Sequence, residues 1–398
     1  MKMKKKLLFV IESLTLGGAE KSLVTLLNLL DYSKYDVDLL LFAQGGAFQK
    51  LLPEEVNLLP VPEYFAYTSV PWSKPAEKMK QPGMLLAQLR YSVAIRTGKH
   101  NHIEKAVLLW ESSRNCFRTM EQEYDVAISY AQGVPTFFVA EKVLAKKKAA
   151  WINAVYEPKG RYLEYIRSMY GHFDTVNGVS EPIAVRIKET FGIPDHKVMV
   201  MKDILDVDFA RKMAQMSSKA ATEMNNTGVK ILTVGRFAIM KCYDLAIDAA
   251  KLLRDRGLDF TWYAVGDGAL REALEHQIAA NGLQDRFILL GSRSNPYPYF
   301  AACDLYVQTS RFEGFGITLA EAKMFHKTIV TTNFDAVGAQ FENEKNGLIV
   351  DISAEAIADG IQRMLSDTEL RERCVANVRA EKLGNTEEME KLYRLIEG

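Results

Sequence analysis

Residues 309–322, with the sequence TSRFEGFGITLAEA, have the composition of a site for a phosphate-containing ligand. Gly314 and Gly316 stand directly before a run of helix-forming residues. Glycine lets a ligand approach the backbone, and a helix that starts at such a turn leaves unpaired N–H groups at the positive end of its dipole. Glu313 and Glu321 lie on either side of the turn, so each carboxylate could hold hydroxyl groups at one end of a ligand. The stretch predicts an anion site between two carboxylates.

The flanking elements determine how these side chains are presented. Residues 304–308 alternate apolar and polar positions like a strand, and residues 317–325 form an apolar, proline-free run typical of a helix. A helix that begins near Gly316 places Glu321 about 7 Å along its axis, since each residue advances a helix by roughly 1.5 Å. That is the scale of a sugar diphosphate between its hexose and its ribose. The alternative is a glycine turn that only starts a helix, with two solvated glutamates.

Composition limits the class of protein. The chain has 398 residues, of which 48% are hydrophobic and 25% charged, an ordinary globular balance that allows two domains. Its 50 basic and 50 acidic residues give a formal net charge of zero, which argues against a nucleic-acid-binding protein. Residues 1–180 carry 23 Lys and Arg against 18 Asp and Glu. This excess fits a membrane surface or an anionic acceptor, and it fits equally a scatter of charges among solvated faces.

The cysteines and the amino terminus bear on the compartment. Cys116, Cys242, Cys303 and Cys374 are far apart and form no CxxC pair, which indicates reduced thiols and not a disulfide framework or zinc site. The apolar run in MKMKKKLLFVIES ends at Glu12, too early for a signal peptide, and no window is apolar enough to span a bilayer. We expect a cytoplasmic protein, with a peripheral position at the inner face of the membrane left open. The oligomeric state does not follow from the sequence.

The first half opens with a strand–helix–strand unit. Residues 7–11 are continuously apolar, as in a strand buried on both faces of a parallel sheet. Gly17 and Gly18 form the turn that follows, residues 19–30 an amphipathic helix, and residues 36–42 the next strand. This order is typical of a doubly wound α/β sheet, although the turn lacks the GxGxxG pattern of a dinucleotide site. The glycine pair fits a ligand-binding turn and also ordinary scaffolding.

The alternation of strands and helices breaks over residues 63–117, which mix aromatic residues, prolines and lysines. A helix is expected at residues 84–95. Four apolar residues fall on one face of that helix: Leu85, Leu86, Leu89 and Val93. The basic residues near Trp72 are Lys74, Lys78 and Lys80. We interpret the segment as an insertion for acceptor specificity or membrane contact, with a plain structural insertion as the alternative.

A second series of strands and helices begins near residue 229. We therefore predict an α/β protein with two Rossmann-like, doubly wound domains facing a cleft. The N-terminal domain is expected to cover residues 1–204 and the C-terminal domain residues 205–382, and residues 383–398 should form a helix packing back on the N-terminal domain. Functional residues should lie at the carboxyl ends of the strands.

Six motifs, in this order, resemble the retaining glycosyltransferases of family 4, which have the glycosyltransferase-B fold. They are GGAE at 17–20, VGRFAIMK at 234–241, GDGALREALE at 266–275, GSRSNPYPYF at 291–300, EGFGITLAE at 313–321 and NGLIVD at 346–351. Each is weak alone, but the ordered combination is specific and covers nearly the whole chain. The resemblance implies an enzyme that moves a hexose from a nucleotide sugar, expected to be UDP-linked. The acceptor would be a glycan, a lipid-linked saccharide, a polyol-phosphate polymer or a protein.

The resemblance also assigns roles to residues. Arg236 and Lys241 match the cations that grip the donor diphosphate, where a departing negative charge needs positive partners. Glu313 matches the carboxylate near the donor sugar, and Glu321 matches the one that binds ribose. The other donor-binding candidates are Gly17 and Gly18 in the first-domain turn, Gly291, Ser292 and Arg293 beside the base, and Gly314, Phe315, Gly316, Ile317 and Thr318 beside the phosphates.

One position departs from the family pattern near the transferred sugar. Asn153 stands where many relatives carry a histidine, and asparagine can hydrogen-bond a sugar hydroxyl but cannot titrate. Asn153 remains a catalytic candidate, and it motivates the alternative of a catalytically silent partner or glycan-binding subunit of another transferase. A nucleotide-sugar epimerase or a phosphorylase on the same fold is a further alternative.

The resemblance implies no metal and no cofactor besides the donor. Asp-x-Asp sequences at 36–38 and 206–208 look like metal motifs, but they fall in an expected strand and in the interdomain connector. We interpret both as structural. Family members of this fold generally stabilise the leaving diphosphate with Arg and Lys in place of a divalent ion.

Overall fold

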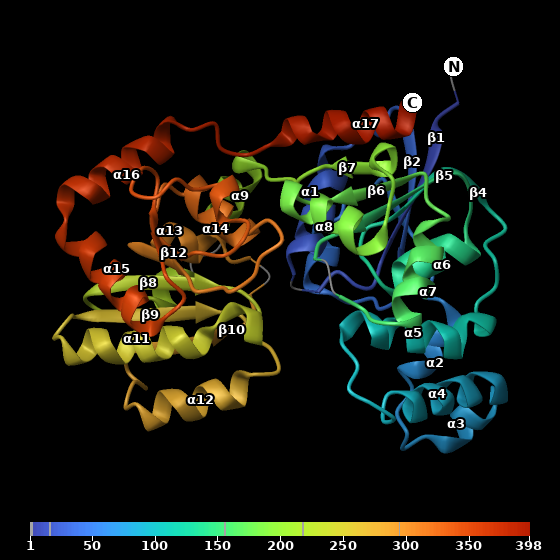
Figure 1. Ribbon diagram of the computed structural model, residues 1–398, viewed down its shortest axis with the longest axis horizontal. Coiled ribbons are helices and arrows are strands. Elements are labelled where there is room, and N and C mark those ends of the chain that lie inside the picture. Colours follow the sequence, from blue (N-terminus) through green and yellow to red (C-terminus); the bar gives the residue numbers. More distant parts are fainter. Residues whose placement is uncertain (1–2, 16, 155–156, 217–218, 294) are drawn as a thin grey trace. The chain divides into compact units, whose positions relative to one another are not determined.

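The computed structural model describes residues 3–15, 17–154, 157–216, 219–293 and 295–398 (Figure 1). The chain forms two compact units. Unit 1 comprises Met1–Ile204 and Glu387–Gly398, and unit 2 comprises Leu205–Thr386. None of the described helices is long and apolar enough to cross a membrane.

Unit 1 is built on a parallel sheet with the strand order β3-β2-β1-β4-β5-β6-β7. Its strands are β1 (Lys5–Ile11), β2 (Tyr35–Leu41), β3 (Val56–Leu58), β4 (Glu123–Ser129), β5 (Leu144–Ile152), β6 (Thr175–Gly178) and β7 (Val198–Val200). Its helices are α1 (Gly18–Leu29), α2 (Glu63–Thr68), α3 (Pro75–Met79), α4 (Pro82–Ala94), α5 (His102–Ser113), α6 (Val134–Lys142), α7 (Arg161–Tyr170), α8 (Glu181–Phe191) and α17 (Met389–Glu397). The apolar run of β1 is fully buried at the centre of the sheet.

Unit 2 contains a second parallel sheet, with the order β10-β9-β8-β11-β12-β13. Its strands are β8 (Val229–Val234), β9 (Phe260–Val265), β10 (Phe287–Gly291), β11 (Leu305–Gln308), β12 (Thr328–Thr332) and β13 (Leu348–Val350). Its helices are α9 (Val207–Gln215), α10 (Lys219–Glu223), α11 (Tyr243–Asp255), α12 (Arg271–Ala280), α13 (Tyr297–Ala302), α14 (Ile317–Met324), α15 (Ala354–Ser366) and α16 (Thr368–Ala380). One apolar core joins α11, α12 and α15 to the sheet.

Both sheets wind outward from a central strand, return, and continue on the other side. The winding direction reverses between β1 and β4 in unit 1 and between β8 and β11 in unit 2. Ligands of such sheets bind outside the carboxyl ends of the strands at this reversal. The predicted fold class, an α/β protein with two doubly wound sheets, is confirmed.

The chain returns from unit 2 to unit 1 after Thr386, four residues beyond the predicted end of the C-terminal domain at residue 382. Residues 383–386 still belong to unit 2, because Asn385 hydrogen-bonds with Leu205, the first residue of that unit. The backbone N–H of Leu205 donates to Asn385 Oδ1 at 2.7 Å, and the N–H of Asn385 donates to the carbonyl of Leu205 at 3.1 Å. In unit 1, α17 packs on the first two strands: the ring of Tyr393 stacks on that of Tyr35 with a centroid distance of 6.0 Å.

Candidate functional site

The loop after β8 is held in place by the glycine turn after β9. The N–H of Phe237 donates to the carbonyl of Asp267 at 2.9 Å. A Cβ atom on Gly268 would overlap the backbone of Phe237, so a larger residue would push the two loops apart. The GDG motif therefore supports the loop that carries Arg236. The side chain of Arg236 is exposed and makes no hydrogen bond or ion pair with any described residue.

The same loop continues into a short 3-10 turn, η4 (Ile239–Lys241), which is tied to the loop after β11. The hydroxyl of Thr309 donates to the carbonyl of Lys241 at 2.7 Å, and the N–H of Arg311 donates to the carbonyl of Met240 at 2.8 Å. Because β8 and β11 are the neighbouring strands at the reversal point of this sheet, the tied loops lie where this fold type binds ligands.

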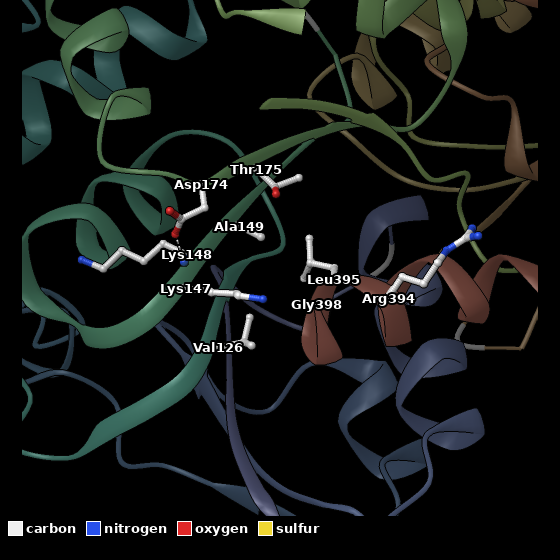
Figure 2. Close-up of a pocket in the computed structure, with 9 residues that line it drawn as sticks. All are labelled: Val126, Lys147, Lys148, Ala149, Asp174, Thr175, Arg394, Leu395 and Gly398. Carbon is white, nitrogen blue, oxygen red and sulfur yellow. Dashed lines mark hydrogen bonds between the residues drawn. The ribbon is translucent and has the colours of Figure 1, made fainter. Parts of the chain in front are cut away.

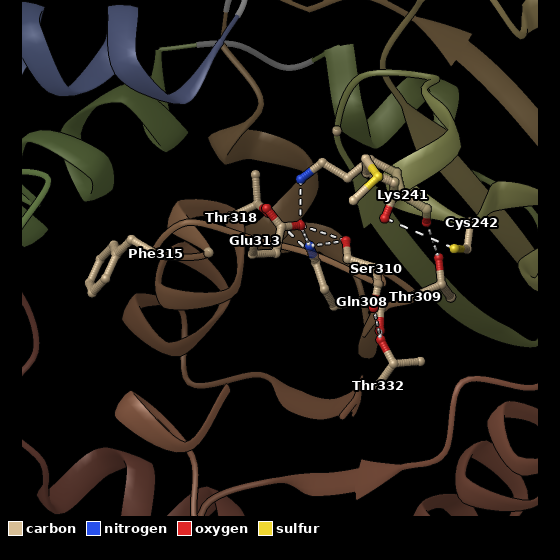
Figure 3. A network of polar contacts seen from close by, with 12 residues as sticks. Lys241, Cys242, Gln308, Thr309, Ser310, Glu313, Phe315, Thr318 and Thr332 are labelled. Atoms are coloured by element: carbon tan, nitrogen blue, oxygen red, sulfur yellow. Dashed lines mark hydrogen bonds and ion pairs between the residues drawn. The ribbon is translucent and has the colours of Figure 1, made fainter. Parts of the chain in front are cut away.

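Lys241 and Glu313 meet at this point (Figure 3). The Nζ atom of Lys241 lies 2.5 Å from Glu313 Oε1, and the same oxygen accepts hydrogen bonds from Gln308 Nε2 and Ser310 Oγ, each at 2.5 Å. The Glu313 side chain is only 11% exposed. Three donors on one oxygen fix the orientation of the Glu313 carboxylate.

Gln308 orients this cluster, and sequence reasoning missed it. Its Oε1 atom accepts hydrogen bonds from the hydroxyl of Tyr306 at 2.5 Å and from that of Thr318 at 3.3 Å. The amide nitrogen must then point toward Glu313. The available sequence signal was a polar residue at the end of an otherwise apolar strand.

The glycine turn and the second carboxylate lie in the same unit. Gly316 caps the amino end of α14 with a φ of 82°, a backbone conformation that favours glycine, and Gln340 Nε2 donates to the carbonyl of Phe315. Glu321 is 1% exposed and accepts a hydrogen bond from the hydroxyl of Tyr297 at 3.1 Å. Burial and the nearby Glu321 raise the pKa of Tyr297 well above its usual value. The alternative of two solvated glutamates is therefore wrong.

In the predicted base-binding segment, the side chain of Arg293 is hydrogen-bonded to two other residues of unit 2. Arg293 Nη2 donates to Glu223 Oε1 at 2.8 Å, and Arg293 Nε donates to the hydroxyl of Tyr299 at 2.9 Å. Gly291 ends β10 with a φ of 78°, and Ser292 follows it. A contact between these residues and a nucleotide base stays a prediction.

The candidates in unit 1 follow its central strands. Gly17 precedes α1 as its N-cap residue, and Gly18 is the first residue of that helix. Asn153 follows β5, and its backbone N–H donates to Gln132 Oε1 at 3.1 Å. Its side-chain Oδ1 is buried and has no hydrogen-bond partner among the described residues. Gln132, which follows β4, was not identified from the sequence.

The two Asp-x-Asp sequences have structural partners. Asp206 caps α9 by accepting hydrogen bonds from the N–H groups of Asp208 and Phe209, at 3.0 and 3.1 Å. Asp38 accepts a hydrogen bond from the hydroxyl of Tyr124 at 2.7 Å. Among the residues that the structure describes, no group of three or more His, Cys, Asp or Glu could hold a metal ion. Metal independence stays a prediction.

A pocket of about 200 Å³ lies in unit 1, away from these candidates (Figure 2). Strand residues that include Lys147 and Thr175 line one side, and Arg394 and Leu395 of α17 line the other. Thr175 begins β6 and Lys147 lies in the first half of β5, so the pocket is nearer the amino ends of the strands. Doubly wound sheets bind their ligands at the opposite edge, and we do not assign the pocket to the donor.

Comparison with known proteins shows which enzymes this chain is similar to. Residues 215–381 match the family model for glycosyl transferases group 1. The matched range contains Arg236, Lys241, Glu313 and Glu321. Alpha-D-kanosaminyltransferase of Streptomyces kanamyceticus is 34% identical over 150 residues, which are 37% of this chain and 39% of that protein.

A second curated relative, from Campylobacter jejuni, is N-acetylgalactosamine-N,N'-diacetylbacillosaminyl-diphospho-undecaprenol 4-alpha-N-acetylgalactosaminyltransferase. It is 28% identical over 185 residues, which are 46% of this chain and 48% of that protein. The chain thus spans less than half the length of these two curated relatives.

Solved structures resemble the whole chain. The Anabaena protein HepE in complex with UDP and glucose has a TM-score of 0.72 at 18% identity, and the match covers 99% of both chains. A mutant of S. aureus TarM, in a complex that includes UDP, has a TM-score of 0.70 at 14% identity and covers 99% of this chain and all of that one. Together, the family model and these relatives show that part of the chain, including residues 215–381, is similar to glycosyltransferases, and the solved structures share the fold of the whole chain.

Proposed function

We propose that this chain is a retaining glycosyltransferase that moves a hexose from a UDP-linked donor to a glycan, a lipid-linked saccharide, a polyol-phosphate polymer or a protein. The observation that carries the proposal is the contact of Lys241 with Glu313 at the reversal point of unit 2. The UDP in the complexes of HepE and TarM supports the choice of donor, and the diphospho-undecaprenol in the name of the Campylobacter enzyme supports a lipid-linked acceptor.

In the proposed reaction, Arg236 and Lys241 stabilise the diphosphate as it leaves. The acceptor oxygen forms its bond to the anomeric carbon on the face from which the diphosphate departs, and a phosphate oxygen takes the acceptor's proton. Lys241 exchanges Glu313 for phosphate when the donor binds, which leaves the Glu313 carboxylate to accept hydrogen bonds from the sugar. The exposed Arg236 supplies a second, rigid positive group.

The proposal places the protein in the cytoplasm. All four cysteines carry free thiols, as expected for a reducing compartment, and three of them are buried. Burial raises the pKa of Cys303 to about 12, so this thiol stays protonated and unreactive at neutral pH.

Replacing Arg236 or Lys241 by alanine tests the proposal. A thermal-shift screen with UDP-, GDP- and dTDP-sugars first identifies the donor, and release of the nucleoside diphosphate then measures turnover. Each variant should lose at least ~100-fold in turnover, the scale of removing one charge-stabilising donor. Lys251→Ala is the matched control, because Lys251 forms a surface ion pair with Asp255 on α11. Near-normal turnover in Lys241→Ala would refute the assignment.

The second candidate function is a catalytically silent partner or glycan-binding subunit. It is favoured by Asn153, whose side chain cannot exchange protons near a transferred sugar. Incubation of the purified protein with the donor separates the two: slow hydrolysis indicates an enzyme, whereas donor binding without any turnover indicates a partner. If the protein is catalytically silent because of Asn153, the substitution Asn153→His should restore measurable donor hydrolysis.

A further inference from the structure

Helix α4 (Pro82–Ala94) exposes an apolar face. Ala87 is its only buried residue, whereas Leu86, Leu89 and Val93 are 49%, 46% and 61% exposed. These positions are three and seven residues apart, so they share one side of the helix. The sequence pattern identified this face, but the face does not pack into the core of unit 1.

The segment before α4 adds two more exposed apolar side chains. Trp72 is 57% exposed and Met79, the last residue of α3 (Pro75–Met79), is 70% exposed. In Figure 1, α3 and α4 lie side by side at the end of unit 1, away from its sheet. We call the five exposed residues the α3–α4 surface: Trp72, Met79, Leu86, Leu89 and Val93.

The segment that carries the α3–α4 surface is rich in positive charge. Residues 70–100 contain six Lys and Arg and a single acidic residue, Glu77. Glu77 pairs with Lys74 at 3.3 Å. Four exposed cations of this segment form no ion pair with any residue in the described ranges: Lys80, Arg90, Arg96 and Lys99.

Lys78 does not belong to that set, and grouping it with Lys74 and Lys80 near Trp72 as a surface cation was wrong. The residue is 1% exposed. Its Nζ atom lies 4.5 Å from the centroid of the Tyr67 ring and 4.9 Å from that of the Trp72 ring, and it donates to Gln88 Oε1 at 3.1 Å. The hydrogen bond therefore links α3 to α4, and the cation–π contacts link α3 to Tyr67 of α2 and to Trp72.

We propose that the α3–α4 surface docks on an anionic lipid bilayer. The apolar side chains would enter the boundary between headgroups and acyl chains, and the four free cations would contact lipid phosphates. Exposed apolar residues in a segment with several cations and a single acidic residue suit attraction to an anionic lipid surface. A second copy of the chain would present the same positive charge, so lipid is the better match for this face. The proposal does not depend on transferase activity, because its test measures lipid binding alone.

The tryptophans allow a direct test. Trp110, Trp151 and Trp262 are at most 1% exposed, so quenching of fluorescence by acrylamide reports mainly on Trp72. Vesicles of phosphatidylglycerol should shift the emission to the blue and protect Trp72 from acrylamide, whereas vesicles of phosphatidylcholine should not. Emission and quenching that stay unchanged with anionic vesicles would overturn the proposal.

Variants distinguish lipid binding by the α3–α4 surface from non-specific adsorption of other exposed apolar residues. Each cation near an anionic membrane contributes about 1 kcal/mol, or roughly five-fold in partitioning, so Arg90→Gln with Arg96→Gln should weaken vesicle binding by about 25-fold. Leu86→Ser with Leu89→Ser should also weaken it. The control is Leu144→Ser with Val185→Ser, two apolar residues exposed elsewhere in unit 1. Equal binding by all variants would refute the proposal, as would a dimer in gel filtration that only the α4 variants dissolve.

Discussion

Asp203 is a buried carboxyl at the end of the first segment of unit 1, and replacing it should change how stability depends on pH. Asp203 is 5% exposed, and its neighbour in the chain, Ile204, is hydrogen-bonded to the buried Ser22. The N–H of Ile204 donates to Ser22 Oγ at 3.1 Å, and the Ser22 hydroxyl shares a hydrogen bond with that of Tyr130 at 2.9 Å. The pKa of Asp203 is raised from 3.8 to about 7, mainly by burial; the hydrogen bond from Ser22 opposes this shift and the charge of Glu20 adds to it.

The direction and size of the effect follow from this raised pKa. Below pH 3.8 the carboxyl is protonated in both the folded and the unfolded chain, and its ionisation costs nothing. As pH rises toward about 7, the unfolded chain releases the proton while the folded chain retains it, so stability falls by about 1.4 kcal/mol per pH unit. Over the whole interval the loss is about 4 kcal/mol, and above it the loss is constant.

Asp203→Asn removes this titration while keeping the size of the side chain. We expect the variant to gain stability relative to the wild type as pH rises from 4 to 7, by up to about 4 kcal/mol, or on the order of 10 °C in Tm at pH 8. Urea unfolding at a series of pH values measures the difference. Asp195→Asn is the control, because the Asp195 side chain is 88% exposed. Parallel stability curves for Asp203→Asn and the wild type would show that the carboxyl is not desolvated.

Two further substitutions test the site in unit 2. Gln308→Leu should lower stability by about 1–3 kcal/mol, because it leaves the buried hydroxyl of Tyr306 without its acceptor, and it should also lower turnover by releasing Glu313. Wild-type stability in urea would contradict this hydrogen-bond network. Gly268→Ala should reduce turnover by displacing the loop of Arg236, whereas Gly83→Ala, where an added Cβ meets nothing within 4 Å, should have no effect on turnover. Equal turnover in the two glycine variants would show that the turn at Gly268 does not position the loop of Arg236.

The fold was predictable because buried parallel strands leave a strong sequence signal. Val229–Val234 and Phe260–Val265 are short, mainly apolar segments, and β8 and β9 begin and end at these residues. Glycine and proline then mark the turns between elements. The strand β3 (Val56–Leu58) was missed, since three partly exposed residues give no period to detect.

Side-chain direction was harder to predict than the elements. A lysine in a basic segment reads as a surface charge, and only the packing of Tyr67 and Trp72 shows that Lys78 turns inward. The resemblance marked Lys241 and Glu313 separately, but their contact depends on the adjacency of β8 and β11, which comes from the winding of the sheet. Gln308 lay outside the family motifs that we used, because its role is to orient another side chain.

The position of α17 in unit 1 has a consequence for biosynthesis. The helix lies against β1 and β2, and Lys5 Nζ donates to the carbonyl of Ile396 at 2.8 Å (Figure 1). A ribosome makes the intervening residues of unit 2 before it makes this helix. During synthesis, the ring of Tyr35 therefore lacks its stacking partner until Tyr393 of α17 has been made, after all of unit 2.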